Sequence, residues 1–242
     1  MKGVILAGGI GSRLFPLTRL MNKHLLPVGR KPMIQYAVEK LAETGITDIL
    51  IVTGKQSAGM YADFLSSGDE WGVSLAYKVQ EKAGGIAEAL SLAESFLSKS
   101  IREKFIVLLG DNLFEDALTE EVERFAKQAH GARVLLKQVD DPRRYGVPIL
   151  REDRIERIEE KPEHPQSSYC VTGIYMYDTD VFDKIRHIVP SERGELEITD
   201  VNNLYAAEGS LTYGVMNGWW TDAGTFASLR EAGDRLGTEE QP

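Results

Sequence analysis

The stretch VILAGGIGSRLFPLT, residues Val4 to Thr18, is the best guide to the fold of this chain. A short apolar run leads directly into three glycines, and an arginine follows them. Glycine has no Cβ, so the backbone here can turn tightly and approach a ligand closely. In open α/β sheets, ligands bind outside the carboxyl ends of the strands. The stretch therefore predicts a buried strand followed by a ligand-binding loop.

Two familiar glycine-loop templates do not fit this loop. The dinucleotide fingerprint G-x-G-x-x-G matches Gly9 and Gly11 but requires a third glycine where the chain has Leu14. The Walker loop ends in Gly-Lys-Ser/Thr, and that triplet occurs nowhere in the sequence. A nicotinamide dehydrogenase is disfavoured for the same reason, so the loop needs another ligand.

The composition points to a soluble globular protein that binds a small anion. Of the 242 residues, 43% are hydrophobic and 27% are charged, and we expect one domain spanning residues 1–242. The net charge of −9 argues against nucleic acid as a partner. The first acidic residue is Glu39, whereas six lysines and arginines precede it. This basic segment around the glycine loop predicts an anionic ligand, although chance clustering on a solvated face is an alternative.

Other chemistries have little support in the sequence. The single cysteine, Cys170, lies in the apolar run CVTGIYMY and is typical of a small buried residue. The four histidines lie far apart, so nothing indicates a zinc site. No apolar run is long enough to span a bilayer, and the N-terminus does not fit a secretory signal. We therefore expect a cytoplasmic protein with no membrane partner.

Strand-like and helix-like patterns alternate along the chain. Buried strands separated by helices are typical of a largely parallel sheet covered on both faces, which is a three-layer α/β/α sandwich with a mixed, mostly parallel, Rossmann-like central sheet. Two expected strands flank a proline-rich connector, so part of the sheet can be antiparallel. Expected strands are 3–6, 48–53, 73–79, 105–109, 132–139, 155–159 and 171–177, and expected helices are 33–41, 58–65, 86–96, 118–129, 180–187, 197–208 and one from about 225.

Several polar residues follow the expected strands. Asp111 comes directly after FIVLL, and a carboxylate held rigidly at a strand end is a good metal ligand. Asp222, in WWTDAGT, is a second candidate, and two carboxylates with substrate phosphates would suit Mg²⁺. Either aspartate could instead cap a helix or turn. Glu160 and Lys161 end another strand before Pro162, where Glu can bind hydroxyls and Lys can bind phosphate, but charged strand ends are common.

The combination of these segments resembles the sugar nucleotidyltransferases, and most of all those that use dTTP and glucose 1-phosphate. The resemblance rests on LAGGIGSRLFPLT and NKHLLPVGRKPMI, followed in the same order by seven further segments. It covers residues 1 to about 235. The seven segments are VQEKAGGIAEAL, LLGDNLF, RRYGV, EEKP, VTGIYMYD, RGELEITDVNN and WWTDAGT.

The resemblance implies that dTTP and α-D-glucose 1-phosphate react to give dTDP-glucose and pyrophosphate, with Mg²⁺ as cofactor. It also implies a homo-oligomer, either a tetramer or a dimer. Asp111 and Asp222 would hold the metal, and Arg13, Lys23, Lys161 and Asp111 would be catalytic. The nucleotide would contact Leu6, Gly8, Gly9, Gly11, Ser12, Arg13, Lys23, Gln80, Gly85 and Asp111, and the sugar phosphate would contact Asn112, Tyr145, Gly146, Glu160, Lys161, Val171 and Arg193.

Two departures from the family pattern leave alternatives open. The base-reading loop has Gly84-Gly85 where relatives often have Asp-Gly, which weakens the expected preference for thymine over uracil. The chain also stops soon after Arg235, whereas longer relatives continue into helices that complete a regulatory nucleotide site. The alternatives are the same reaction with UTP or another hexose 1-phosphate, or a non-catalytic nucleotide-sugar-binding subunit.

Overall fold

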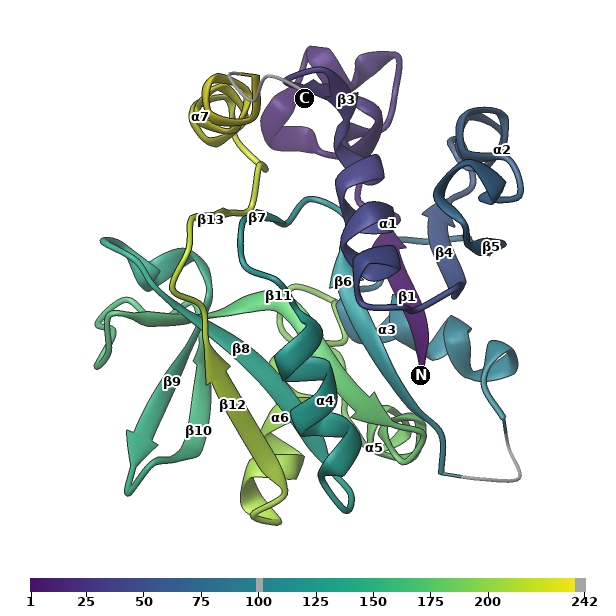
Figure 1. The fold of residues 1–242 in the computed structure, drawn as a ribbon. Coiled ribbons are helices and arrows are strands. Elements are labelled where there is room, and N and C mark those ends of the chain that lie inside the picture. The colour runs from purple at the N-terminus through teal and green to yellow at the C-terminus, as the bar shows by residue number, and fades with distance from the viewer. Residues whose placement is uncertain (99–101, 238–242) are drawn as a thin grey trace.

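A computed structural model describes residues 1–98 and 102–237. At its centre lies a seven-stranded sheet in the order β12-β8-β11-β6-β1-β4-β5 (Figure 1). All neighbours pair in parallel except β11, which runs antiparallel to both β6 and β8. The mixed, mostly parallel sheet expected from the sequence is thus confirmed. The strands are β1 (Lys2–Ala7), β4 (Asp48–Gly54), β5 (Ser74–Gln80), β6 (Lys104–Leu109), β8 (Ala132–Gln138), β11 (Tyr169–Asp178) and β12 (Leu211–Val215).

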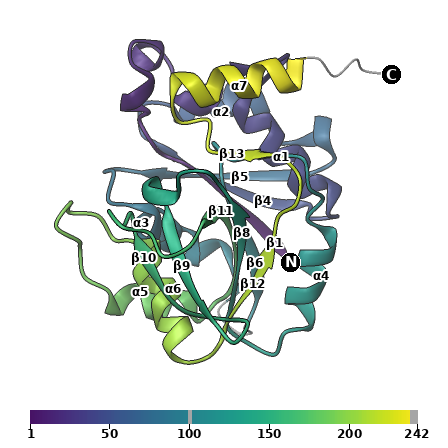
Figure 2. The same ribbon diagram turned by 90° about the vertical axis from the view of Figure 1, so that its left-hand side faces the viewer.

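Helices cover both faces of this sheet, which confirms the three layers. On one face lie α1 (Met33–Glu43), α2 (Ala58–Leu65) and α4 (Thr119–Lys127), and on the other lie α3 (Ile86–Ser91), α5 (Val181–His187) and α6 (Ile198–Ala207). Figure 2 shows α1 and α4 on the right of the sheet and α3, α5 and α6 on the left. A last helix, α7 (Phe226–Gly237), packs on β2 (Pro27–Val28).

The alternation of side chains along β1 explains why this strand is apolar throughout. Successive residues of a strand point to opposite faces of the sheet. Val4 and Leu6 contribute to the core under α3, α5 and α6, whereas Ile5 and Ala7 contribute to the core under α1, α2 and α4. Because both faces are covered, the four residues Val4 to Ala7 are all buried and apolar, and the only polar residue of β1 is Lys2 at its start.

The strand order places the opening loop opposite a second loop. From β1 the chain continues to β4 on one side, and β6 then pairs with the other side of β1. The loops after β1 and β6 therefore diverge at this point, which is where open α/β sheets bind their ligands. The backbone N–H of Gly110 donates to the carbonyl of Leu6 at 3.0 Å. The loops after β1 and β6 therefore begin side by side at the same edge of the sheet.

The structure corrects the sequence-based interpretation at three places. The strands β9 (Gly146–Arg151) and β12 were not expected; β9 contains Pro148, and β12 is an edge strand with mixed burial. The expected strand 155–159 is β10 (Arg154–Glu160), but it pairs with β9 in a separate two-stranded sheet. The expected helix 86–96 is α-helical only to Ser91 and continues as a 3₁₀ helix over Leu92–Phe96.

The remaining short elements border the loops. These are β3 (Lys31–Pro32), which pairs with β2, and β7 (Leu113–Phe114), which pairs with β13 (Trp220–Thr221), together with 3₁₀ turns at Ser12–Leu14, Leu17–Arg19, Lys23–Leu25, Asp69–Trp71 and Pro142–Arg144. Within the two described ranges, no helix has both the length and the apolar character that a bilayer span requires.

Candidate active site

A cavity of about 420 Å³ opens at the carboxyl ends of β1, β5 and β6. It collects segments that are far apart in the sequence, including the β9–β10 hairpin, residues 193–199 and the end of β13. Of the residues predicted from the sequence, it is lined by Leu6, Gly8, Gly9, Arg13, Lys23, Gln80, Gly85, Asp111, Asn112, Tyr145, Gly146, Glu160, Lys161, Val171, Arg193 and Asp222. Only Gly11 and Ser12 of that set lie outside the lining.

The opening loop is held in shape by side chains that follow it. The amide of Asn22 donates to the carbonyls of Ala7 and Gly9, and the Thr18 hydroxyl donates to the carbonyl of Gly11 at 2.9 Å. Gly11 has φ +67°, in the left-handed region that favours glycine. The chain then enters the 3₁₀ turn Ser12–Leu14, in which Arg13 lines the cavity while Gly11 and Ser12 do not.

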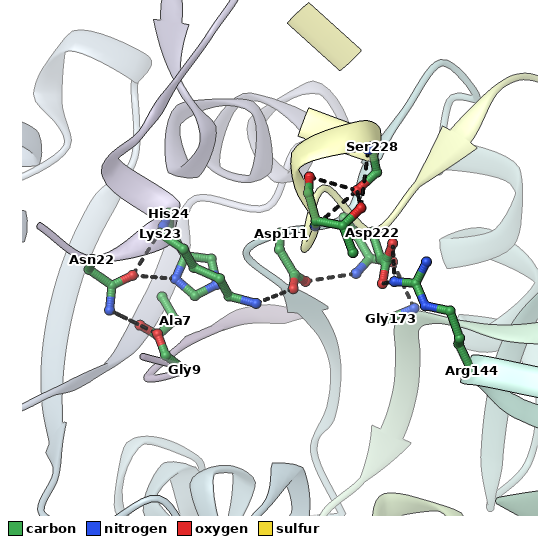
Figure 3. Close-up of polar contacts among 12 residues, drawn as sticks. Ala7, Gly9, Asn22, Lys23, His24, Asp111, Arg144, Gly173, Asp222 and Ser228 are labelled. Atoms are coloured by element: carbon green, nitrogen blue, oxygen red, sulfur yellow. Dashed lines mark hydrogen bonds and ion pairs between the residues drawn. The ribbon is translucent and has the colours of Figure 1, made fainter. Parts of the chain in front are cut away.

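Asp111 and Lys23 form an ion pair in the cavity wall. The Lys23 ammonium contacts Oδ2 of Asp111, while Nδ2 of Asn112 donates to Oδ1 at 3.0 Å (Figure 3). Burial by itself would raise the pKa of Asp111, but the charge of Lys23 and these hydrogen bonds bring it down to about 2. The carboxylate therefore stays ionised at neutral pH, as a metal ligand must.

Asn112 is fixed by its neighbours. Its Oδ1 accepts hydrogen bonds from the backbone N–H of Gly173 and from the Trp220 indole N–H, both at 2.8 Å. A Cβ on Gly173 would lie 2.5 Å from Nδ2 of Asn112, so the close packing of β11 on this amide requires glycine. The amide thus positions Asp111 and ties β11 and β13 to the cavity.

Asp222 lies on the same cavity and carries a different basic partner. Nη2 of Arg144 lies 3.0 Å from Oδ2 of Asp222, and Figure 3 shows the two aspartates between Lys23 and Arg144. Burial and the negative charge of Asp111 raise the pKa of Asp222, whereas Arg144 and Arg13 lower it. A cation between the two carboxylates would relieve their repulsion, so this donor set fits a divalent metal that also binds substrate phosphate.

The part of the cavity between the end of β10 and residues 193–199 is rich in carboxylates and cations. β10 ends at Glu160, and Lys161 follows with φ +46°, an uncommon conformation that turns both side chains to the cavity. The Thr199 hydroxyl donates to Oε2 of Glu160 at 2.6 Å. Arg193 lies within ion-pair distance of three glutamates, which are Glu160, Glu195 and Glu197.

Sequence reasoning missed several lining residues. Arg144, Glu195, Glu197, Thr199 and Trp220 line the cavity. Each lies inside a segment that carried the resemblance, but nothing in the local pattern sets it apart from an ordinary surface or core residue. His24 also lines the cavity and is buried; burial, with the charge of Lys23, lowers its pKa to about 3. Within residues 1–98 and 102–237, no group of three or more His, Cys, Asp or Glu side chains is arranged to hold a metal ion, so Asp111 and Asp222 would need ligands from the substrate as well.

Comparison with known proteins identifies the family of this chain. The family model for nucleotidyl transferases matches residues 2–239, and the chain belongs to this family, whose members generally need a divalent metal. A glucose-1-phosphate thymidylyltransferase of Neisseria meningitidis is 42% identical over 96% of this chain and 81% of its own length. The corresponding protein of an Actinoplanes species is 40% identical over 97% of this chain and 77% of its own length.

Solved structures agree with this assignment. A candidate glucose-1-phosphate thymidylyltransferase of Bacillus anthracis, solved with sucrose, superposes with a TM-score of 0.94 and 55% identity, covering 100% of this chain and 97% of that one. A UDP-glucose pyrophosphorylase complexed with UDP-glucose superposes with a TM-score of 0.86 and 26% identity, covering 97% of each chain.

Proposed function

We propose that this nucleotidyltransferase joins dTTP and α-D-glucose 1-phosphate to give dTDP-glucose and pyrophosphate. A phosphate oxygen of the sugar phosphate forms a bond to the α-phosphorus of dTTP, and the bond from that phosphorus to the bridging oxygen of pyrophosphate breaks. The observation that carries the proposal is the single cavity in which Asp111 and Asp222 lie among Arg13, Lys23, Lys161 and Arg193. The similarity to thymidylyltransferases over nearly the whole chain supports the choice of substrates.

The opening loop and the end of β5 would hold the nucleotide. Gly8 and Gly9 leave their backbone open to the triphosphate, and the cations of Arg13 and Lys23 would neutralise it. Gln80 ends β5 and Gly85 precedes α3, so both lie where the base would be read. A Cβ on Gly85 would lie 2.5 Å from the carbonyl oxygen of Leu196, so the close approach of these loops requires glycine.

The β9–β10 hairpin and the segment before α6 would hold the sugar phosphate. Glu160 would accept hydrogen bonds from sugar hydroxyls, with Tyr145, Gly146 and Val171 beside it. The ammonium of Lys161 and the guanidinium of Arg193 lie 3.1 and 3.5 Å from Oε1 of Glu160. Both cations are therefore placed to bind the phosphate of a sugar that Glu160 holds.

Asp111 and Asp222 would hold Mg²⁺ together with phosphate oxygens. When bound, the metal would supply positive charge to the triphosphate. The residues themselves do little covalent chemistry, because the attacking sugar phosphate is already ionised and needs no general base. Their work is to position two anions that repel each other and to neutralise charge.

The experiment that tests the proposal is pyrophosphate release from a panel of substrates with Mg²⁺. The panel pairs dTTP, UTP, dCTP and dATP with glucose 1-phosphate, and dTTP with galactose and mannose 1-phosphates. We expect dTTP with glucose 1-phosphate to give the highest kcat/KM. A higher value for UTP or for another sugar phosphate would change the assigned substrates, and no release from any pair would contradict catalysis.

A further inference from the structure

The side-chain amide of Gln80 has a defined orientation. Its Nε2 donates to Oε2 of Glu88, which lies in the first turn of α3. An ionised carboxylate only accepts hydrogen bonds. The amide nitrogen must therefore face Glu88, and the amide oxygen must face the opposite way.

The oxygen of the same amide lies against Gly8 of the opening loop, which lines the cavity. A Cβ on Gly8 would lie 2.2 Å from Oε1 of Gln80, so this oxygen occupies the space that the missing side chain leaves. In the described part of the chain, no group donates a hydrogen bond to Oε1. This oxygen is also absent from the fully buried side-chain atoms that have no partner, so it is accessible to a ligand. Gln80 also lines the cavity. The oxygen is thus a free acceptor that a ligand can use.

The Glu88 side chain can contact Gln80 because Gly84, which packs against it, has no side chain. A Cβ on Gly84 would lie 3.0 Å from Cγ of Glu88 and 3.3 Å from its Cβ. Gly84 is the position at which this chain departs from the Asp-Gly of its relatives. An aspartate there would crowd the stem of Glu88 and bring a second negative charge to it. Gly84 and Glu88 therefore belong together as a local arrangement.

We propose that Glu88 is a positioning residue that makes the site select bases with an N3–H group, thymine and uracil, over cytosine. The inference rests on the proposed function in one respect, that Gln80 contacts the base. With Nε2 held by Glu88, Oε1 accepts from N3–H, and the second hydrogen of Nε2 donates to the adjacent carbonyl oxygen. Cytosine has an acceptor at N3 and an amino group beside it. Cytosine N3 would therefore face Oε1 of Gln80, two acceptors, and the cytosine amino group would face Nε2–H, two donors.

Cytosine would fit only if the amide turned over. The flipped amide would direct its oxygen at the Glu88 carboxylate, leaving two acceptors face to face and a partly buried hydrogen bond unmade. Glu88 therefore selects through Gln80 rather than by touching the nucleotide. A glutamine at position 88 would remove this constraint, since its own amide can either accept from or donate to Gln80.

The test compares Glu88→Gln with the wild type in the binding of dTTP and dCTP, measured by isothermal titration calorimetry with Mg²⁺, and in turnover of both with glucose 1-phosphate. We expect the ratio of the dCTP and dTTP dissociation constants to fall about tenfold, almost wholly through tighter binding of dCTP. The affinity for dTTP should change by less than about twofold. Glu94→Gln, which removes a surface carboxylate paired with Arg186, is the matched control and should leave the ratio unchanged.

The outcomes separate this inference from the proposed function. General damage to the site would weaken both nucleotides alike, and that result, like an unchanged ratio, overturns the role of Glu88. Equal affinity of the wild type for the two nucleotides overturns it as well. Because binding is measured without turnover, selective binding of dTTP with no pyrophosphate release would contradict the proposed catalysis while the change of ratio in Glu88→Gln still supports the inference.

Discussion

Arg144 and Asp222 form an ion pair with 3.0 Å between Nη2 and Oδ2 on the wall of the cavity. Lys23 pairs in the same way with Asp111, so each carboxylate proposed to bind metal already has a basic partner. A metal ion that binds Asp222 has to compete with the guanidinium of Arg144. The side chain of Arg144 is 42% exposed, so this pair stabilises the protein only modestly.

Removal of Arg144 should therefore make metal binding easier. We expect Arg144→Gln to lower the dissociation constant for Mn²⁺ by about two- to fivefold, which corresponds to an ion pair of roughly 0.4–1 kcal/mol. The measurement is Mn²⁺ titration followed by electron paramagnetic resonance. Arg143→Gln, whose partner Asp141 lies outside the cavity lining, is the control and should not change the constant. Weaker Mn²⁺ binding in Arg144→Gln would mean that Arg144 does not compete with the metal.

Asp111→Asn should abolish most turnover while preserving the fold. The substitution keeps the shape of the side chain but removes the charge that would hold the metal and that pairs with Lys23. We expect kcat/KM to fall about a hundredfold or more, on the order of 3 kcal/mol of transition-state stabilisation. Circular dichroism should show unchanged secondary structure. Near-normal turnover by a folded variant would remove Asp111 from the mechanism.

Lys161→Ala should affect one substrate far more than the other. The Lys161 side chain lies beside Glu160, in the part of the cavity that we assign to the sugar phosphate. We expect KM for glucose 1-phosphate to rise about tenfold and KM for dTTP to change less than about twofold. Steady-state kinetics with each substrate varied in turn provides the measurement. Similar increases for both substrates would contradict the assignment, and Lys55→Ala, which removes an exposed surface cation, should alter neither.

The layers of the fold could be predicted from the sequence because β1 and β6 are apolar on both faces. Such strands form only where helices cover both sides of a sheet, and the segments between them show helical spacing. β12 could not be predicted in the same way, because it lies at the sheet edge and only part of it is buried. β9 contains Pro148, which hides its character as a strand.

The same distinction applies to the site. Asp111 could be predicted as a candidate because it closely follows the buried strand β6, and Glu160 with Lys161 because Pro162 marks the end of another strand, β10. Arg144 gives no such signal, since its partner Asp222 lies 78 residues further along the chain. Only the fold brings the 3₁₀ turn Pro142–Arg144, which precedes β9, close to the residue that follows β13, so the pair could not be inferred from local sequence. The same holds for Thr199, whose contact with Glu160 spans 39 residues.

Cys170 should be unreactive in the folded protein. The thiol is buried in β11, and burial raises its pKa to about 12. The thiolate is the reactive form, and at pH 8 a thiol with this pKa is ionised to only about one part in ten thousand. Alkylation by iodoacetamide, followed by mass spectrometry, should therefore be slow at pH 8 and should accelerate as the pH rises toward 12, as long as the protein stays folded. Rapid labelling in guanidinium chloride is the control, and equally rapid labelling without denaturant would contradict the burial of Cys170.

Gly8→Ala should weaken nucleotide binding without destabilising the fold greatly. The new Cβ would lie 2.2 Å from Oε1 of Gln80, so the amide has to leave the place where it meets the base. We expect KM for dTTP to rise about tenfold or more and KM for glucose 1-phosphate to change little, as measured by steady-state kinetics. Gly59→Ala is the matched control, because its Cβ would meet no atom within 4 Å and the residue lies within α2, where alanine is favoured. That control should keep wild-type kinetics and raise the melting temperature slightly. An unchanged KM for dTTP in Gly8→Ala would show that the position of the Gln80 amide does not matter for the nucleotide.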